Sequence, residues 1–276
     1  MQNLVYPGIK AIAAQLGVTL MTIDSDINGP LLEPLETLCK AGKLSALYLN
    51  PTIQNPTALT ISRERRESIA ELALRYNLPL IEDDAYGMLP KSPVVPLADL
   101  APGITYYISG LSKCSSVGLR IGFLHAPNKL LAQRTAGALR ALTVMASPVI
   151  CNLVSQWIMD GTIDTMLAAI RDESRARQKI AQRYLSKATY YAHEYGFHLW
   201  LTLPPHMQQN PTALAAHLRA NNISAVSSSA FCTDNSPPDA IRLCLGGPTT
   251  QTNCEEALQL VSDMLEHPEH LNGLVL

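Results

Sequence analysis

The sequence SGLSK at Ser109–Lys113, followed by GLRIG at Gly118–Gly122, is where the fold of this 276-residue chain can first be recognised. The two segments place Lys113 seven residues before Arg120. A lysine amine condenses with carbonyl groups, and an arginine guanidinium binds phosphate oxygens at two points through its planar fork of donors. Because most lysines are solvated surface charges, the pair indicates a ligand with an aldehyde and a phosphate only if other residues support it.

Two apolar runs upstream of this stretch end in polar residues. Leu80–Ile81 is typical of a short buried strand, and it leads directly into the acidic sequence EDDAY at Glu82–Tyr86. Ala46–Leu49 is a second apolar run, and it opens into NPTIQNPT at Asn50–Thr57. Because open α/β sheets bind ligands beyond the carboxyl ends of their parallel strands, we expect these segments to meet at one site.

Short apolar strands alternate with helical patterns in the first part of the chain. This alternation predicts an α/β fold with a mostly parallel, helix-covered sheet. A helix is expected at Arg63–Tyr76, with Ser62 as its N-terminal cap. The expected strands are Val18–Ile23, Ala46–Leu49, Leu80–Ile81, Tyr106–Ile108 and Ile121–Leu124.

The remainder of the chain predicts a smaller α+β lobe. A helical region extends from Lys129 to about Tyr191, with a break at Asp160-Gly161. Beyond it, Phe197–Leu203 alternates in hydrophobicity like a half-buried strand. A helix at Pro211–Ala220 and a strand around Arg242 complete this lobe.

The helix break divides the expected fold into two domains. We place a partial large domain at approximately residues 1–160, and the long helix with a small C-terminal domain at approximately residues 161–276. A cleft between these two lobes would put Lys113 opposite Arg242.

Four motifs, taken in order, resemble the fold-type I, pyridoxal-phosphate-dependent aminotransferases of class I and II. They are QNPT at 54–57, EDDAY at 82–86, LSK at 111–113 and GLR at 118–120. The chain is most similar to the aminotransferase-like domain of the MocR branch of GntR-family transcriptional regulators, through TYYI at 105–108 and IRLCLGG at 241–247. The resemblance covers nearly the whole chain. It implies the aspartate-aminotransferase-like fold, with pyridoxal 5'-phosphate as the cofactor.

The resemblance also implies roles for individual residues toward the cofactor ring. Lys113 would hold the cofactor as a Schiff base and, once substrate displaces it, move the α-proton of the substrate. Asp83 would face the pyridine nitrogen and keep it protonated, so that the ring can accept electrons. Asn55 and Tyr86 would hydrogen-bond the phenolic oxygen. The peptide bond between Asn55 and Pro56 is expected to be cis, as is common in this family.

Four further residues acquire roles from the same resemblance. Ser112 and Arg120 would contact the phosphate of the cofactor. Tyr6 would stack on the pyridine ring. Arg242 would bind the α-carboxylate of the substrate, which is a natural partner for a guanidinium flanked by apolar residues.

The chain also departs from the family pattern. A serine commonly stands three residues before the lysine, where this chain has Gly110, so one phosphate-binding hydroxyl is missing. Ala58 stands where the family usually has glycine, and if that position needs a positive φ, alanine costs about 1 kcal/mol. Family members carry a longer segment before the sequence YPG at 6–8, so we expect this chain to be N-terminally truncated.

Composition predicts a globular enzyme domain, with 47% hydrophobic residues, 16% charged residues and a net charge of -2. No apolar run approaches the ~18 residues of a membrane span, and no signal peptide pattern is present, so we expect a cytoplasmic protein without membrane contact. Six cysteines without CxxC spacing indicate neither a metal site nor a disulfide framework. The basic series from Arg171 to Arg183 is expected to be a solvated helix face, without nucleic-acid binding through this chain.

Three functional hypotheses remain open. The first is a pyridoxal-phosphate-dependent aminotransferase domain that moves an amino group between an amino acid and a 2-oxo acid through a Schiff base on Lys113. The second is the effector-binding domain of a MocR-type regulator, without its DNA-binding part. The third is a truncated remnant without activity. The expected partners are an amino acid or 2-oxo acid, as substrate or effector, and a second copy of the chain in a homodimer.

Overall fold

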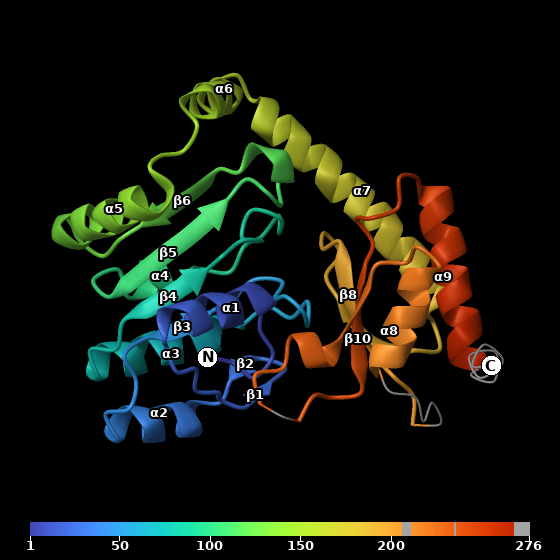
Figure 1. Cartoon of the computed structure of the whole chain (residues 1–276), viewed down its shortest axis with the longest axis horizontal. Helices are drawn as coiled ribbons and strands as arrows, with labels where there is room; N and C mark the ends of the chain where they lie inside the picture. The colour runs from blue at the N-terminus through green and yellow to red at the C-terminus, as the bar shows by residue number, and fades with distance from the viewer. Residues whose placement is uncertain (206–210, 235, 268–276) are drawn as a thin grey trace. The chain divides into compact units, whose positions relative to one another are not determined.

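The computed structural model describes residues 1–205, 211–234 and 236–267, and its internal contacts separate it into two compact units. Unit 1 consists of residues 1–2, 23–52 and 60–170, and unit 2 consists of residues 3–22, 53–59 and 171–276. The units therefore interleave along the sequence. Figure 1 shows the elements of both units, coloured by residue number.

Unit 1 is built around a four-stranded sheet of order β3-β4-β5-β6 (Figure 1). The first three strands are parallel, and β6 pairs antiparallel with β5. The predicted α/β fold with a mostly parallel sheet is thus confirmed, and the carboxyl ends of three strands lie at one edge. The strands are β3 (Leu47–Leu49), β4 (Leu80–Asp83), β5 (Thr105–Gly110) and β6 (Gly122–His125).

The predicted strand at Val18–Ile23 is wrong. In the described chain, the strand-like pairing of this run is a single bridge between Ile23 and Gln2. A strand needs a neighbour for its backbone N–H and C=O groups, and this run has no such ladder. The nearby pairing is a two-residue ladder between β1 (Ser25–Asp26) and β2 (Gly29–Pro30) instead.

The main core of unit 1 lies between the sheet and its helices. Ser62 caps α3 as predicted, because its side chain accepts a hydrogen bond from the Arg65 backbone N–H at 3.2 Å. The buried face of α3, which includes Ile69, joins Leu35 and Leu80 in one hydrophobic cluster. The helices are α2 (Leu32–Lys40), α3 (Arg63–Arg75), α4 (Leu97–Leu100), the short 3-10 helix η1 (Val117–Leu119), α5 (Lys129–Thr143) and α6 (Pro148–Met159).

Unit 2 contains an antiparallel sheet of order β7-β8-β10-β9 with helices packed against it. The predicted helix at Pro211–Ala220 and the predicted strand around Arg242 are confirmed as α8 and β10. Helix α7 (Thr162–Tyr184) begins in unit 1 and continues into unit 2. The other elements are α1 (Pro7–Leu16), β7 (Thr189–Ala192), β8 (His198–Thr202), α8 (Pro211–Ala220), β9 (Ala225–Ser227), η2 (Ser228–Ala230), β10 (Ala240–Cys244) and α9 (Gln251–Glu266).

Two predictions about this unit are corrected. The long helical region ends at Tyr184 and not near Tyr191, because Thr189–Ala192 pairs with β8 as the edge strand β7. Strand β8 is not half-buried, because His198 and Trp200 are buried as well as the leucines. The His198 Nε2 atom lies 3.1 Å from the Gln54 carbonyl oxygen, so polar contact covers the side that the alternation assigned to water.

The sequence predicts a solvated face for the basic series on α7, and this prediction is wrong for one of its residues. Arg177 is buried, and its Nη1 donates hydrogen bonds to the carbonyl oxygens of Leu245 at 2.6 Å and Pro248 at 2.8 Å. Its Nε donates to Glu173 at 2.7 Å. Arg177 therefore anchors the turn between β10 and α9 to the long helix.

The described part of the chain contains no helix that is both long and apolar enough to cross a membrane. Within that part, no group of three or more histidine, cysteine, aspartate and glutamate side chains is placed to hold a metal ion. The six cysteines are free thiols.

A fully buried guanidinium ties together the loops of unit 1 that follow the strands. Arg66, on α3, donates from Nε to the Ile61 carbonyl at 3.1 Å and from Nη2 to the Pro51 carbonyl at 3.0 Å. It also donates to Thr52 Oγ1 at 3.1 Å and to the Val95 carbonyl at 3.3 Å. These contacts hold the segment after β3 against α3.

Glu82, in β4, balances the Arg66 charge at a distance of 3.8 Å. Its two carboxylate oxygens accept the backbone N–H groups of Leu97 at 2.9 Å and Ala98 at 2.8 Å, which begins helix α4. Burial raises the pKa of Glu82 to about 7, while the hydrogen bonds from the two N–H groups oppose that shift. Glu82 therefore has a structural role, because it joins β4 to the start of α4 and to Arg66.

Replacing Arg66 with methionine should lower the free energy of unfolding by about 3–5 kcal/mol, because Glu82 would lose its buried counter-charge. Arg63→Met is the matched control on the same helix: the Arg63 side chain is 69% exposed and pairs with Glu67. That change should alter stability by less than about 0.5 kcal/mol. Urea unfolding followed by circular dichroism measures both variants, and equal stabilities would contradict the anchoring role of Arg66.

Candidate functional site

The carboxyl ends of β4 and β5 border a pocket in unit 1 with a volume of about 230 Å³. Four of the predicted site residues line it together: Asp83, Ser112, Lys113 and Arg120. Asp83 is the last residue of β4, and Ser112 and Lys113 follow the end of β5. The parallel pairing of β4 with β5 places Asp83 beside Ile108, so the acid and the lysine segment share one sheet edge.

Asp83 is held by two side chains of the neighbouring strand segment. Tyr48 Oη donates a hydrogen bond to Asp83 Oδ2 at 2.6 Å, and Asn50 Nδ2 donates to the Asp83 carbonyl at 2.5 Å. Burial raises the pKa of Asp83, and the Tyr48 hydroxyl and the Lys113 charge both oppose that shift. Sequence reasoning missed Tyr48 and Asn50, although both lie in the run that leads into the QNPT motif.

Lys113 lies beside Tyr86. Its Nζ is 5.4 Å from the centre of the Tyr86 ring, within the range of a cation–π contact. Tyr86 is buried, so the ring limits the space that the lysine amine can explore. Lys113 and Tyr86, both predicted as site residues, are therefore adjacent in the structure.

Arg120 reaches the pocket from a strained backbone position. It follows η1 with a φ of 52°, a left-handed conformation that costs energy for a residue with a side chain. Ser116 caps η1 by accepting the Gly118 N–H at 3.2 Å. The turn therefore holds a strained arginine at the edge of the pocket.

Gly110 has a steric reason to replace the serine of the commonest family pattern. It pairs with Gly122 across the antiparallel β5–β6 ladder. A Cβ atom at Gly110 would lie 3.2 Å from the Ile121 carbonyl oxygen, which is tighter than most contacts in proteins. A serine would therefore crowd the strand that carries the pocket wall.

The third acid of the EDDAY motif supports the turn and does not line the pocket. Asp84 is buried, its Oδ2 accepts a hydrogen bond from Tyr107 Oη at 3.0 Å, and its Oδ1 has no hydrogen-bond partner among the described residues. A Cβ atom on Gly87 would lie 2.1 Å from Asp84 Oδ2. Burial and the Asp84 charge raise the pKa of Tyr107. The glycine is needed so that the Asp84 carboxylate fits beneath the turn.

Two other predicted residues meet in unit 2. Arg242, in the centre of β10, donates from Nη1 to Asn55 Oδ1 at 2.9 Å, although the two residues are 187 positions apart. The Arg242 guanidinium lies 5.1 Å from the centre of the Phe231 ring. Its Nε is buried and has no hydrogen-bond partner among the described residues. A donor of this kind is suited to an incoming carboxylate.

The turn that carries Asn55 has the features expected from the family motif. The Asn55-Pro56 peptide bond is cis, as predicted. Ala58 has a φ of 59°, so the glycine of the family pattern is replaced by a residue in a left-handed conformation. Gln54 closes the turn, because its backbone N–H bonds the Leu59 carbonyl at 2.7 Å and its carbonyl accepts the Ala58 N–H at 2.7 Å.

Tyr6 lies in unit 2, immediately before α1, and its side chain is half exposed. The ring lies over Gly8, where an added Cβ would come within 2.2 Å of it. The stacking role of Tyr6 stays a prediction.

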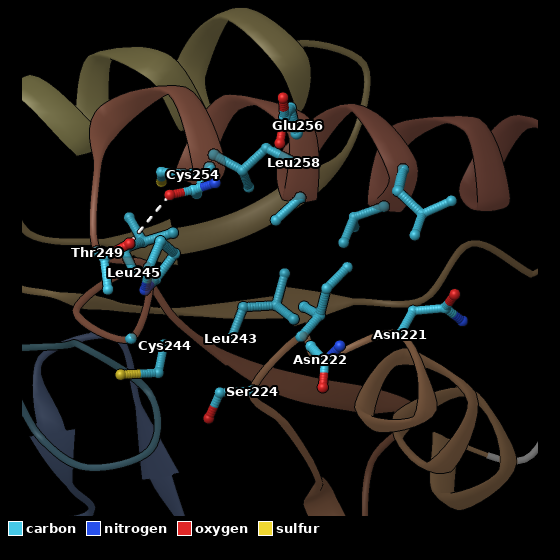
Figure 2. Close-up of a pocket in the computed structure, with 17 residues that line it drawn as sticks. Asn221, Asn222, Ser224, Leu243, Cys244, Leu245, Thr249, Cys254, Glu256 and Leu258 are labelled. Carbon is cyan, nitrogen blue, oxygen red and sulfur yellow. Dashed lines mark hydrogen bonds between the residues drawn. The ribbon is translucent and has the colours of Figure 1, made fainter.

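A larger cavity, of about 590 Å³, lies in unit 2 between the end of β10 and helix α9 (Figure 2). Leucines such as Leu243 and Leu258 line it together with the polar residues Asn221, Asn222 and Glu256. No lysine, arginine or histidine of the described chain lines this cavity. It therefore offers neither an amine for an aldehyde nor a cation for a phosphate, and the smaller pocket of unit 1 is the better candidate site.

Comparison with known proteins supports the assignment made from the motifs. The family Aminotransferase class I and II matches residues 1–261. The chain therefore belongs to the class I and II aminotransferase family. Its relatives include transcriptional regulators as well as aminotransferases, in agreement with the predicted resemblance to MocR-type regulators.

Two curated relatives represent these two groups. The chain is 31% identical over 263 residues to the uncharacterized HTH-type transcriptional regulator YdeF of Bacillus subtilis, covering 95% of this chain and 56% of the regulator. It is 28% identical over 191 residues to aromatic-amino-acid aminotransferase 1 of Thermococcus litoralis, covering 66% of this chain and 46% of the enzyme. The chain thus spans about half the length of these relatives.

Solved structures of similar fold include LysN, an α-aminoadipate aminotransferase from Thermus thermophilus, complexed with N-(5'-phosphopyridoxyl)-L-leucine. The TM-score is 0.86 at 22% identity, with 99% of this chain and 71% of that chain covered. This similarity confirms the aspartate-aminotransferase-like fold.

Membership of this family implies pyridoxal 5'-phosphate as the cofactor, and the donor set of the unit 1 pocket fits that molecule. Lys113 offers an amine for its aldehyde, and Asp83 a carboxylate for its ring nitrogen. Ser112 and Arg120 offer a hydroxyl and a guanidinium for its phosphate.

Gly87→Ala should lower the free energy of unfolding by about 1–3 kcal/mol, because the new methyl group displaces the buried Asp84 carboxylate from its Tyr107 partner. Gly103→Ala is the matched control, since a Cβ atom there meets no atom within 4 Å. That control should be neutral or stabilising by up to about 1 kcal/mol. Thermal unfolding compares the two variants, and a stable Gly87→Ala protein would contradict the packing argument.

Proposed function

We propose that this chain binds pyridoxal 5'-phosphate through Lys113 and catalyses amino-group transfer between an amino acid and a 2-oxo acid. The observation that carries this proposal is the single pocket lined by Asp83, Ser112, Lys113 and Arg120. These side chains supply an acid, a hydroxyl, an amine and a guanidinium within about 230 Å³. Each one matches a different functional group of the cofactor.

Residues of unit 1 would bind and orient the cofactor. Arg120 and Ser112 would hold the phosphate through charge-assisted and neutral hydrogen bonds. The Asp83 carboxylate would hold a proton on the ring nitrogen. Tyr86 would hydrogen-bond the phenolic oxygen from its buried position beside Lys113.

The bound cofactor supplies an electron sink for the electron pair released when the α C–H bond of an amino acid breaks. Lys113 Nζ would accept that proton as a general base and then donate it, as a general acid, to the carbon of the cofactor that carried the aldehyde. Asp83 must remain ionised to hold the ring proton. The Tyr48 hydrogen bond and the Lys113 charge favour ionisation against the effect of burial, which raises the pKa of Asp83.

Residues of unit 2 would bind the substrate and the ring. The Arg242 guanidinium would bind the substrate carboxylate, and its buried Nε, which has no partner among the described residues, supports that role. Asn55 accepts a hydrogen bond from Arg242 and would itself donate through its amide to the phenolic oxygen of the cofactor. Tyr6 would stack on the ring.

A second function uses the same residues without turnover. The similarity to the regulator YdeF over 95% of this chain favours an effector-binding domain that holds the cofactor and recognises an amino compound. The two proposals differ in one property, because a transaminase must release a 2-oxo acid from the amino acid and a sensor need not. For both functions, we propose a homodimer as the assembly.

Purified chain incubated with pyridoxal phosphate should develop the visible absorbance of lysine-bound cofactor, and borohydride should fix the cofactor on the peptide that contains Lys113. Lys113→Ala should lose both signals, because no other residue of the pocket carries a primary amine. Lys43→Ala, which removes an exposed lysine of the same unit, should keep them. If the intact chain shows no such absorbance, both the enzyme and the sensor proposals fail.

Mixing the cofactor-loaded chain with a panel of amino acids should release the matching 2-oxo acid, which mass spectrometry detects. Spectral change on binding without release of a 2-oxo acid would favour the sensor.

Arg242→Met should slow conversion of amino acids by about 10²-fold, the effect of losing a charged hydrogen-bond pair of about 3 kcal/mol. It should leave binding of amines that lack a carboxylate unchanged. Arg219→Met, which changes an exposed arginine of α8, is the control. Equal loss for amino acids and simple amines would exclude Arg242 as the carboxylate-binding residue.

A further inference from the structure

Tyr48 reaches Asp83 because of the register of the sheet. In the parallel β3–β4 ladder, Tyr48 pairs with Ile81, and Asp83 lies two residues further along β4. Side chains two positions apart in a strand lie on the same face, so Tyr48 and Asp83 are diagonal neighbours on that face. Their separation is within reach of a tyrosine, and the hydroxyl lies 2.6 Å from Asp83 Oδ2.

The same strand segment also holds the backbone of Asp83. Asn50, which follows β3, donates its amide to the Asp83 carbonyl at 2.5 Å. The side chain and the main chain of Asp83 are therefore both bound from one neighbouring segment. Glu82 and Asp84 point to other partners, so Asp83 is the acid of this motif that lines the pocket.

We propose that Tyr48 is a positioning residue for Asp83: its hydroxyl fixes the direction of the carboxylate and keeps it charged, so that Asp83 can hold the ring nitrogen of the cofactor in its protonated form. The inference rests on the proposed function, because it gives Asp83 the role of partner to that nitrogen. Tyr48 itself does not line the pocket and acts through Asp83.

The charged and titratable groups around Asp83 determine how loss of the Tyr48 hydroxyl changes the pKa of Asp83. Burial and the neighbouring Asp84 charge raise the pKa of Asp83, whereas the Tyr48 hydroxyl, the Ala85 backbone N–H and the Lys113 charge lower it. Removing the Tyr48 hydroxyl therefore raises the pKa of Asp83 further. A proton shared between Asp83 and the ring nitrogen then moves toward the carboxylate.

The test compares Tyr48→Phe with Tyr106→Phe. Tyr106 is a matched control, because it pairs with Ile81 from the other side, on β5, and its hydroxyl makes no hydrogen bond among the described residues. Each variant is loaded with pyridoxal phosphate labelled with ¹⁵N at the ring, and the ¹⁵N chemical shift is recorded. Tyr48→Phe should move this shift toward that of the unprotonated ring, in the direction of the Asp83→Asn benchmark. Tyr106→Phe should match the unaltered chain.

Kinetics give a second readout if the chain proves to be a transaminase. Tyr48→Phe should lower kcat by about tenfold with little change in KM, because the electron sink is weakened while substrate contacts are kept. An unchanged ¹⁵N shift in Tyr48→Phe, together with a clear change in Asp83→Asn, overturns the proposal and leaves Tyr48 a packing residue.

A measurement without cofactor separates this inference from the proposed function. The carboxyl ¹³C signal of Asp83 is titrated in the cofactor-free chain and in both tyrosine variants. A higher midpoint in Tyr48→Phe alone supports the control of Asp83 by Tyr48 even if Lys113 fails to bind the cofactor, in which case only the proposed function fails. Identical midpoints in all three proteins overturn the inference, whether or not the cofactor binds.

Discussion

The buried Arg66 guanidinium is the interaction on which the site of unit 1 depends. It binds backbone carbonyls of the segment after β3, of Ile61 just before α3 and of the loop before α4, and it lies 3.8 Å from Glu82. Such a charge is tolerated in the interior only when carbonyls and a counter-charge surround it. By satisfying them together, Arg66 holds the segment after β3 beside Glu82 of β4. The neighbouring residues Tyr48, Asn50 and Asp83 lie at or just after the ends of these two strands.

The three acids of the EDDAY motif have different surroundings, because successive side chains of a strand point to opposite faces of the sheet. Glu82 lies on the face that begins α4, and Asp83 lies on the face that borders the pocket. Asp84, beyond the strand, is buried against Tyr107 and Gly87. Three adjacent carboxylates thus avoid sharing one environment. Of the three acids, only Asp83 lines the same pocket as Lys113, and it accepts a hydrogen bond from Tyr48 on the neighbouring parallel strand.

Unit 2 assembles its polar pair from distant parts of the chain. Asn55 belongs to a seven-residue segment, 53–59, that packs with the C-terminal half, although the residues on both sides of it belong to unit 1. The buried His198 donates a hydrogen bond from Nε2 to the Gln54 carbonyl oxygen and so joins β8 to this segment. The sequence NPTIQNPT at Asn50–Thr57 therefore begins in unit 1, directly after β3, and continues into unit 2. There, Asn55 accepts a hydrogen bond from Arg242.

The sequence by itself determined the alternating strands and helices and the cap at Ser62, because each depends on local periodicity or on a short motif. The cis bond before Pro56 and the position of Lys113 near Asp83 were implied by the resemblance of its motifs to a known family. It did not predict that Thr189–Ala192 would be a strand, that Arg177 and Trp200 would be buried, or that Tyr48 would hold Asp83. Those features depend on which strand lies beside which and on what covers each face. Only the tertiary structure decides them, since partners many residues away supply the hydrogen bonds and remove the water.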